Sequence, residues 1–273
     1  MVSELVSFIK KNNFLIFLIF FTPFLALAET SIEDYRKYDV TKTKFTLEKS
    51  AKDLSYPWAL SFIDKTNIVI TEKDGGIYKV DVLSGKKQKI KHNIPHIGYD
   101  GGGQGGLLDV YFNPSDGYTY FTYSHKSSKL TRSKQLSKKS STAIARGRLI
   151  ENEIKDFEIL LIAKPEFLEN RHYGSRIAIK GDDLFVSFGE RGQGMISQDP
   201  SKHPGSIVRI KTDGAIPADN PRSIEKKDWL PEIYVIGVRN PQGIAVSPHD
   251  DEIYFSSHGP RGGDHIGEVE FGS

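Results

Sequence analysis

The feature that most constrains the fold is a short unit that recurs along the chain: an apolar run, a polar turn that contains Asp, and a second apolar run. The unit is found in "YPWALSFIDKTNIVITEK", "GLLDVYFNPSDGYTYFTYSHK", "SRIAIKGDDLFVSFGERG" and "PQGIAVSPHDDEIYFSSHGPRGG". Apolar runs of this length between turn residues predict β-hairpins. If Thr71, Thr122, Ser187 and Ser256 are equivalent positions, the spacing is roughly 50 to 70 residues, which is typical of propeller blades.

The rest of the chain supports an all-β fold. No amphipathic helix of three turns can be recognised after residue 40, and the Lys-rich segment 124–148 is expected to form a polar hairpin or loop. We therefore predict a β-propeller, with a sandwich or a β-helix as the alternatives. At about 60 residues per blade, residues 29–273 supply about four blades. A closed ring of four blades and a part of a larger ring both remain open.

The N-terminal segment differs from the remainder. Lys10 and Lys11 precede an apolar run from Phe14, and the run ends at Ala26-Leu27-Ala28. This order predicts a signal peptide, residues 1–28, followed by a propeller domain, residues 29–273, and a periplasmic or secreted protein with no stable membrane insertion after cleavage. An uncleaved anchor is the alternative, but the apolar run is shorter than the roughly 20 residues that a spanning helix needs.

Composition excludes several functional classes. The chain has no cysteine, which excludes disulfides, cysteine nucleophiles and thiolate metal sites. It has 37 Lys and Arg against 35 Asp and Glu, for a net charge of +2. Because the two signs are interspersed, no nucleic-acid partner is expected.

Four polar loops hold the candidate functional residues. They are "YDGGGQGGLLD" with Gln104, "NRHYGSR" with His172, "GVRNPQG" with Arg239 and Asn240, and "SHGPRGGDHIGE" with His258. We assign all four to equivalent places in the repeat. Because equivalent loops of successive blades meet at one end of a propeller, we expect Gln104, His172, Arg239 and Asn240 to share a site.

Each residue type suits a particular chemical role, although each one alone is also common as a structural or surface residue without such a role. A neutral His172 can act as a general base. Arg239 offers a permanent cation to an oxyanion or carboxylate. The glycines around Gln104 allow a ligand to approach the backbone. In the last loop, exposed carbonyl oxygens near Asp264 and Glu268 suit a hard cation.

Taken together, the segments are more specific than any one of them. "PWALSF", "GQGGLLDVYFNP", "HYGSRIAIKGDDLFVSFGERG", "GSIVRIKTDGAIPADNP", "GVRNPQGIA" and "SHGPRGGDHIGEV" resemble, in this order, the soluble aldose dehydrogenases of the glucose/sorbosone type that depend on pyrroloquinoline quinone (PQQ). The resemblance runs from about Tyr56 to the end. It implies a six-bladed propeller that uses PQQ and calcium to oxidise the anomeric hydroxyl of a sugar to a lactone, and an external electron acceptor.

The resemblance also implies roles for individual residues. His172 matches the general base, Arg239 the residue that polarises the quinone carbonyl, and Asn240 its cofactor-binding neighbour. Gln104 matches a residue near the sugar, and the carbonyls of Gly259 and Pro260 match ligands of the calcium ion.

Some positions depart from the family pattern. Ser175 and Ser257 stand where the family has Gly and Glu, and residues 265–267 replace a run like Glu-Leu-Asn. Because the family continues for about two more blades beyond Ser273, we expect a truncated member that lacks part of the cofactor site.

Two other functions remain as alternatives. A propeller lactonase would hold a metal with several carboxylates at its central loops, whereas these loops carry Gln, His and Arg. A non-catalytic sugar-binding propeller fragment would bind no quinone.

Overall fold

The computed structural model describes residues 49–127 and 138–273, and the chain divides into two units, Met1–Lys49 and Ser50–Ser273. The expected signal peptide and the centre of the Lys-rich segment, residues 128–137, lie outside the described residues. Among the residues that are described, no helix is long and apolar enough to cross a membrane. The fold below is that of the second unit.

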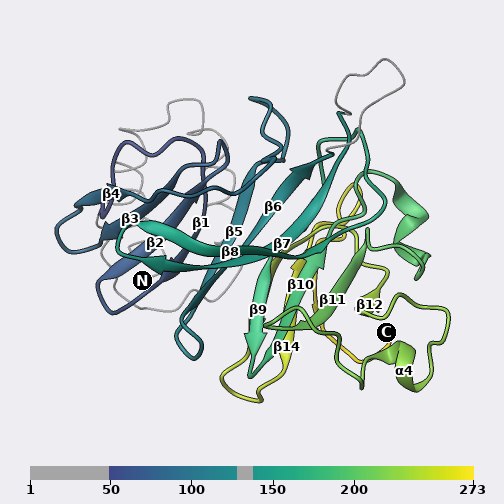
Figure 1. Ribbon diagram of the computed structural model, residues 1–273. Coiled ribbons are helices and arrows are strands. Elements are labelled where there is room, and N and C mark those ends of the chain that lie inside the picture. Colours follow the sequence, from purple (N-terminus) through teal and green to yellow (C-terminus); the bar gives the residue numbers. More distant parts are fainter. Residues whose placement is uncertain (1–48, 128–137) are drawn as a thin grey trace, which may run out of the picture. The chain divides into compact units, whose positions relative to one another are not determined.

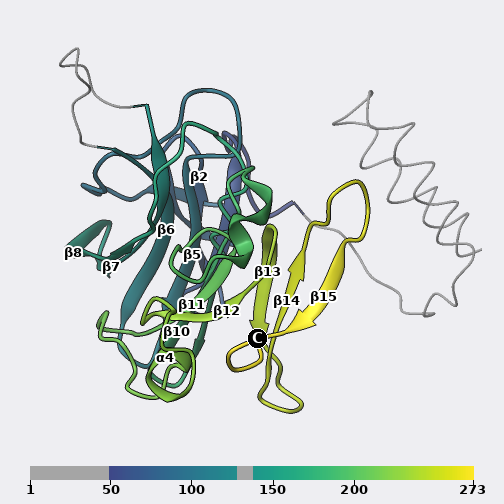
Figure 2. The ribbon, with the colours of Figure 1, turned by 90° about the vertical axis from the view of Figure 1, so that its right-hand side faces the viewer.

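The second unit contains four antiparallel sheets, which we number as blades one to four (Figure 1). Within each sheet, every strand pairs with the next strand along the chain. Blade one has β1 (Pro57–Phe62), β2 (Asn67–Glu72), β3 (Ile77–Asp81) and β4 (Lys87–Lys89). Blade two has β5 (Leu107–Asn113), β6 (Tyr118–Lys126), β7 (Ser140–Ile150) and β8 (Glu153–Ile162). Blade three has β9 (Ile177–Lys180), β10 (Asp183–Phe188), β11 (Ser206–Lys211) and β12 (Ile233–Ile236). Blade four has β13 (Pro241–Val246), β14 (Ile253–Ser257) and β15 (His265–Glu268), which lie side by side in Figure 2.

The described helices are short: η3 (Gly194–Gln198) and α4 (Pro221–Ile224). The prediction of an all-β propeller with about four blades is therefore confirmed.

Aspartate fixes the turn between the first two strands in three of the blades. Asp64, Asp116 and Asp250 each accept a hydrogen bond from the backbone N–H two residues later, at 2.8, 2.8 and 3.1 Å. This bond imitates a backbone turn and favours the chain reversal. Asp116 and Asp250 also accept a hydrogen bond from a tyrosine hydroxyl of the following strand.

The hydrophobic core lies between neighbouring blades. On β6, Phe121 packs into the cluster shared with blade one, whereas the adjacent Tyr120 packs into the cluster shared with blade three. On β10, Val186 faces blade two and Phe185 faces blade four. Because successive side chains of a strand point to opposite faces, the middle blades bury both faces, and their second strands, β6 and β10, are buried over most of their length.

The first strands of all four blades lie at the centre. Residues of β1, β5, β9 and β13 line one axial cavity of about 400 Å³. The sheets therefore radiate from a common axis, and the loops at one end of their inner strands come close together.

A hydroxyl group marks each junction between blades. Thr71, Thr122 and Ser187 are fully buried on the second strands and donate to backbone carbonyls of the next blade. Their acceptors are Leu108 at 2.6 Å, Ser175 at 2.6 Å and Pro241 at 3.4 Å. The fourth equivalent residue, Ser256, is exposed, and its Oγ has no partner among the described residues. The four positions chosen from the sequence are thus equivalent in the fold.

Candidate active site

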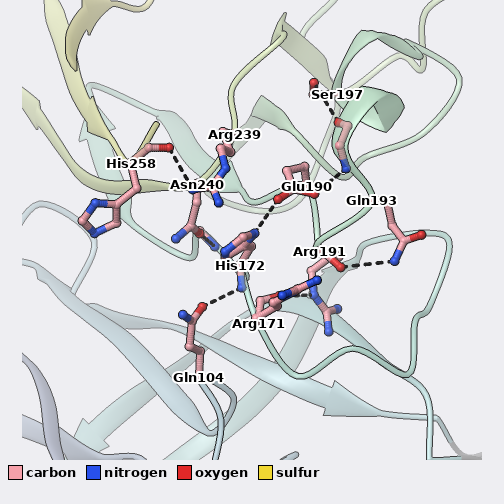
Figure 3. A network of polar contacts seen from close by, with 12 residues as sticks. Gln104, Arg171, His172, Glu190, Arg191, Gln193, Ser197, Arg239, Asn240 and His258 are labelled. Atoms are coloured by element: carbon pink, nitrogen blue, oxygen red, sulfur yellow. Dashed lines mark hydrogen bonds and ion pairs between the residues drawn. The ribbon is translucent and has the colours of Figure 1, made fainter. Parts of the chain in front are cut away.

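The candidate site is built from two sets of loops at one end of the blades. The loops before β5, β9 and β13 carry Gln104, His172, and Arg239 with Asn240. The loops after β2, β10 and β14 carry Lys73, Glu190 and His258. The placement of His258 in a loop equivalent to the first three was therefore wrong, since it follows a second strand. Both sets nevertheless meet in one network of polar contacts (Figure 3).

His172 forms the centre of this network. Its Nδ1 is hydrogen-bonded to Oε1 of Glu190, and its backbone N–H donates to Oε1 of Gln104 at 2.6 Å. Glu190 is 3% exposed, and its other oxygen accepts the Gly194 N–H at 2.7 Å, so the carboxylate is fixed. Because Nδ1 is used, Nε2 remains as the ring nitrogen with no partner among the described residues, and it is the atom available to accept a proton.

The backbone around His172 is constrained. His172 has φ +52°, in the left-handed region that costs most residues energy. Gly189 follows β10, and a Cβ there would lie 2.2 Å from the His172 carbonyl oxygen, so only glycine allows the two loops to touch. The buried Arg191 holds the same loop, since its Nε donates to the Arg171 carbonyl at 2.9 Å. The strained backbone of His172 is thus held from two sides.

Ser175 stands where the family pattern has glycine, and its hydrogen bonds explain how a serine occupies this position. It has φ +83° and is fully buried, so glycine is the residue that this position favours. Its N–H donates to the Ser187 carbonyl at 2.6 Å, and its Oγ donates to the Tyr173 carbonyl at 3.2 Å. These bonds hold a non-glycine residue in this conformation.

The Gly-rich loop brings Gln104 to His172. Gln104 donates its backbone N–H to the Asn170 carbonyl at 2.9 Å, and its side chain is exposed. At Gly106, with φ +144°, a Cβ would lie 2.3 Å from the Lys73 carbonyl oxygen. The glycine there serves close packing between blades rather than ligand access.

Asn240 joins blades three and four. It is 3% exposed, and its Oδ1 accepts the Gly174 N–H at 3.1 Å, while its own N–H donates to Ser257 Oγ at 3.2 Å. Its Nδ2 makes no hydrogen bond to any described residue and remains a donor for a ligand. Ser257, which departs from the family glutamate, supports Asn240 from behind.

Arg239 lies beside Asn240 but is held loosely. Its Nη1 donates to the His258 carbonyl at 3.3 Å, and its other guanidinium nitrogens have no partner among the described residues. Arg239 also accepts the Glu190 N–H on its carbonyl at 2.8 Å, which ties the two loops together.

The proposed calcium ligands lie on the turn after β14. Gly259 donates its N–H to Asp264 Oδ1 at 2.8 Å, and this bond, followed by the His258 contact, lowers the pKa of the Asp264 carboxyl. The carbonyls of Gly259 and Pro260 accept no hydrogen bond from the described residues, so both are free to face a cation. Among residues 49–127 and 138–273, no group of three or more His, Asp or Glu could hold a metal ion.

A cavity of about 250 Å³ adjoins the network. It is lined by Trp58, Lys73, Gly103, Gln104, Leu108, Tyr173, Gly174, Asn240, Gln242 and His258. Of the candidate residues, Gln104, Asn240 and His258 line it directly. The lining does not include His172, Arg239, Gly259 or Pro260. His172 is nevertheless hydrogen-bonded to Gln104 and immediately precedes Tyr173, and both of these residues line the cavity.

The fold and the site together define a β-propeller with a pocket lined by polar side chains among the loops at one end of its blades. The chain belongs to the glucose/sorbosone dehydrogenase family, whose sequence model matches residues 54–273.

Among known relatives, aldose sugar dehydrogenase YliI of Escherichia coli (strain K12) is 33% identical over 220 residues, which cover 78% of this chain and 56% of YliI. Quinoprotein glucose dehydrogenase B of Acinetobacter calcoaceticus is 26% identical over 238 residues, 78% of this chain and 48% of that protein. The chain thus spans about half the length of these curated relatives.

Solved structures show the same fold. The apo-form of the soluble aldose sugar dehydrogenase from Escherichia coli has a TM-score of 0.72 at 31% identity, covering 82% of this chain and 63% of that one. A glucose dehydrogenase structure has a TM-score of 0.73 at 28% identity, with 83% and 64% covered.

Sequence reasoning missed Glu190 and Lys73, which lie in this site. Both follow the second strand of a blade, the position from which only His258 had been selected. Treating every loop after a second strand as equivalent would have found them. Lys73 donates from Nζ to the Gly103 carbonyl at 2.7 Å and so holds the Gln104 loop.

Proposed function

We propose that the protein is a PQQ-dependent sugar dehydrogenase that oxidises the anomeric hydroxyl of an aldose to the lactone. The observation that carries the proposal is His172, whose Nδ1 is fixed by Glu190 and whose Nε2 has no partner among the described residues. Its backbone N–H is bound by Gln104, which lines the adjoining pocket together with Asn240. Membership of the family and the names of its dehydrogenase relatives support it.

In this proposal, His172 removes the proton of the anomeric hydroxyl. Nε2 accepts the proton, and the adjacent Glu190 carboxylate stabilises the imidazolium that forms. Gln104 uses Oε1 to hold the His172 backbone, so its Nε2 is left to donate to a sugar oxygen.

The residues present supply part of a site for an anionic quinone and its calcium ion. When bound, PQQ supplies the two-electron acceptor for the hydride of the anomeric carbon. Arg239 and Asn240 Nδ2 would donate to it, and the free carbonyls of Gly259 and Pro260 would bind calcium. Because two electrons must then leave the site, an external electron acceptor is part of the proposal.

Export is also part of the proposal. The basic segment, apolar run and Ala-Leu-Ala sequence at the N-terminus support cleavage after Ala28 and a periplasmic or secreted enzyme. N-terminal sequencing of the exported protein tests it, and a mature protein that still begins at Met1 would contradict it.

Reconstitution is the experiment that tests the activity. The purified chain is incubated with PQQ and calcium chloride, and dye-linked oxidation is followed with a panel of aldoses. Oxidation that is lost in His172→Asn and kept in the exposed control His249→Asn supports the proposal. Absence of PQQ binding, measured by absorbance after gel filtration, contradicts it and favours the non-catalytic sugar-binding alternative. Lactone hydrolysis without quinone would favour the lactonase.

A further inference from the structure

Trp58 is the largest flat side chain in the lining of the site cavity. It lies on β1 and is partly buried, and it shares the cavity with Lys73, Gln104 and Gln242. An apolar ring beside convergent amide and ammonium donors is an arrangement that suits a ligand with both C–H and hydroxyl groups. None of the residues discussed so far uses this ring.

A cation holds the Trp58 ring. The guanidinium carbon of Arg176 lies over the indole, 4.9 Å from the ring centre. Arg176 Nη1 is in turn 3.4 Å from Asp109 Oδ1, and Asp109 is 5% exposed. Such a stack of a cation on an indole limits the movement of both side chains.

Asp109 is firmly placed at the junction of blades two and three. Its Oδ2 accepts the Ile177 N–H at 2.9 Å, and its Oδ1 accepts the Val110 N–H at 3.0 Å. The carboxylate therefore connects the inner strand of blade two to that of blade three, and its remaining capacity faces Arg176. The chain of contacts runs from the backbone of β9 to the indole of β1.

The stacked pair adjoins two cavities. Trp58 lines the site cavity of about 250 Å³, whereas Arg176 and Asp109 line the axial cavity of about 400 Å³. Removing the guanidinium would leave the indole without support on the axial side.

We propose that Trp58 is an aromatic subsite on which the apolar face of a pyranose ring stacks, and that Arg176, anchored by Asp109, is the positioning residue that holds the indole for this contact. The inference rests on the proposed function, because it names the ligand of the same pocket. It assigns to the pocket a preference for ring sugars over open-chain polyols with the same hydroxyl groups.

The sugar fits this position better than the quinone does. Gln104, the proposed sugar contact, lines the cavity together with Trp58. Arg239, Gly259 and Pro260, the proposed contacts of PQQ and calcium, do not line it. Asn240 lies in both sets and places the two ligands next to each other.

Protonation of Asp109 offers a second readout. Burial raises the pKa of its carboxyl to about 6, against the opposing effects of Arg176 and the two backbone N–H groups. Below that pH the carboxyl is neutral and the attraction to Arg176 is lost. The KM for the sugar should therefore rise as the pH falls through 6, and Asp109→Asn should remove this dependence.

Tryptophan fluorescence tests the positioning role without any enzyme activity. The chain has two tryptophans, so in a Trp229→Phe background the emission comes from Trp58 alone. We expect Arg176→Gln to raise acrylamide quenching of Trp58 about twofold and Arg176→Lys to restore part of the protection, as expected for a cation over a ring. Equal quenching in all three proteins would overturn the positioning role. Thermal melts check that each variant is folded.

Sugar binding tests the subsite. In the same background, D-glucose should change the Trp58 emission and sorbitol should not. In the reconstituted enzyme, Trp58→Ala should raise KM about tenfold with kcat within about twofold, the pattern of a lost binding contact. If aldoses are oxidised but KM is unchanged, or if Trp58→Ala weakens PQQ binding instead, the subsite is wrong and the proposed function stands. If no aldose is oxidised but glucose still changes the emission, the subsite stands and the proposed function fails.

Discussion

Among the described residues, two histidines are paired with glutamates, the partly buried His172 and the buried His203, and the pairs differ in whether a ring nitrogen remains without a partner. His172 gives Nδ1 to Glu190 and keeps Nε2 without a partner among the described residues. His203 uses both nitrogens, because Nδ1 accepts the Lys164 N–H at 2.9 Å and Nε2 is 2.5 Å from Glu232 Oε1. A histidine with both ring nitrogens hydrogen-bonded stabilises the fold. A histidine with one ring nitrogen unpaired, close to a site, can accept a proton from a substrate.

The surroundings of the two pairs also differ, since one pair lies in the core and the other lies in a strained loop at the site. His203 is 4% exposed and packs edge-on against Phe188, away from the lining of the site cavity. His172 has a left-handed backbone, a conformation that persists because its neighbours hold it. The His172–Glu190 pair therefore includes a strained backbone, whereas the His203–Glu232 pair stabilises the core.

Removing only the free nitrogen of His172 should have the largest effect. In His172→Asn, the amide nitrogen stands where Nδ1 was and can still donate to Glu190, while Nε2 is gone. We expect the rate of sugar oxidation in the reconstituted enzyme to fall about 10²- to 10⁴-fold, the range for loss of a general base. The free energy of unfolding should stay within about 0.5 kcal/mol of the parent. A rate within tenfold of the parent would show that His172 is not the base.

His203→Ala should reverse the pattern. It leaves the Glu232 carboxylate and the Lys164 N–H unpaired in the core, so we expect the free energy of unfolding to fall by roughly 3 kcal/mol in urea denaturation. The oxidation rate per folded molecule should be unchanged. A variant that is as stable as the parent but inactive would erase the distinction between the two pairs.

Glu190→Gln should have an intermediate effect. The amide oxygen can still accept from Nδ1, but the negative charge that stabilises a protonated His172 is lost. We expect the oxidation rate to fall about tenfold to a hundredfold, since general base catalysis as a whole is worth about 10²- to 10⁴-fold. The surface variant Glu158→Gln, which removes a half-exposed partner of Arg146, is the matched control and should leave the rate unchanged.

The smallest effect is expected for the acid stability of Glu232→Gln. Burial alone would raise the pKa of Glu232, but the hydrogen bond and ion pair with His203 outweigh it and lower the pKa below 4.5. Because the unfolded chain then takes up the proton first, this carboxylate stabilises the parent above about pH 4.5 and loses that effect as the pH falls through the lowered value. Urea titrations at pH 7 and pH 3 should show a larger loss of stability in the parent than in Glu232→Gln, because the variant lacks the contribution of this carboxylate. Identical pH curves would contradict the assignment.

The fold could be predicted from the sequence because its signals are local. The turn between the first two strands of each blade contains an Asp, and the alternation of side chains on the strands follows from period two. The residues Gln104, His172 and Asn240 could be grouped because the loops that hold them precede the first strands of three successive blades.

The difference between His172 and His203 could not be predicted in this way. Both stand in loops with nearby Gly and polar residues, "NRHYGS" and "SKHPGS". What separates them is the position of Glu190 and Glu232, one after a second strand and one before a fourth, and this depends on how the blades are packed. The role of Trp58 could not be predicted either, because its partner Arg176 lies 118 positions away in the sequence and the two meet only in the folded chain.

The hydroxyl contacts between blades have a consequence for how such sequences change over time. Thr71, Thr122 and Ser187 all donate to a main-chain oxygen of the following blade. Every residue type provides that oxygen, so the receiving strand can exchange its side chains without breaking the contact. Only the hydroxyl residue on the second strand then has to be kept for this contact, because the side chain at the acceptor position is free to change. This is one physical route by which a chain only 31% identical to the Escherichia coli aldose sugar dehydrogenase can keep a backbone that superposes with a TM-score of 0.72.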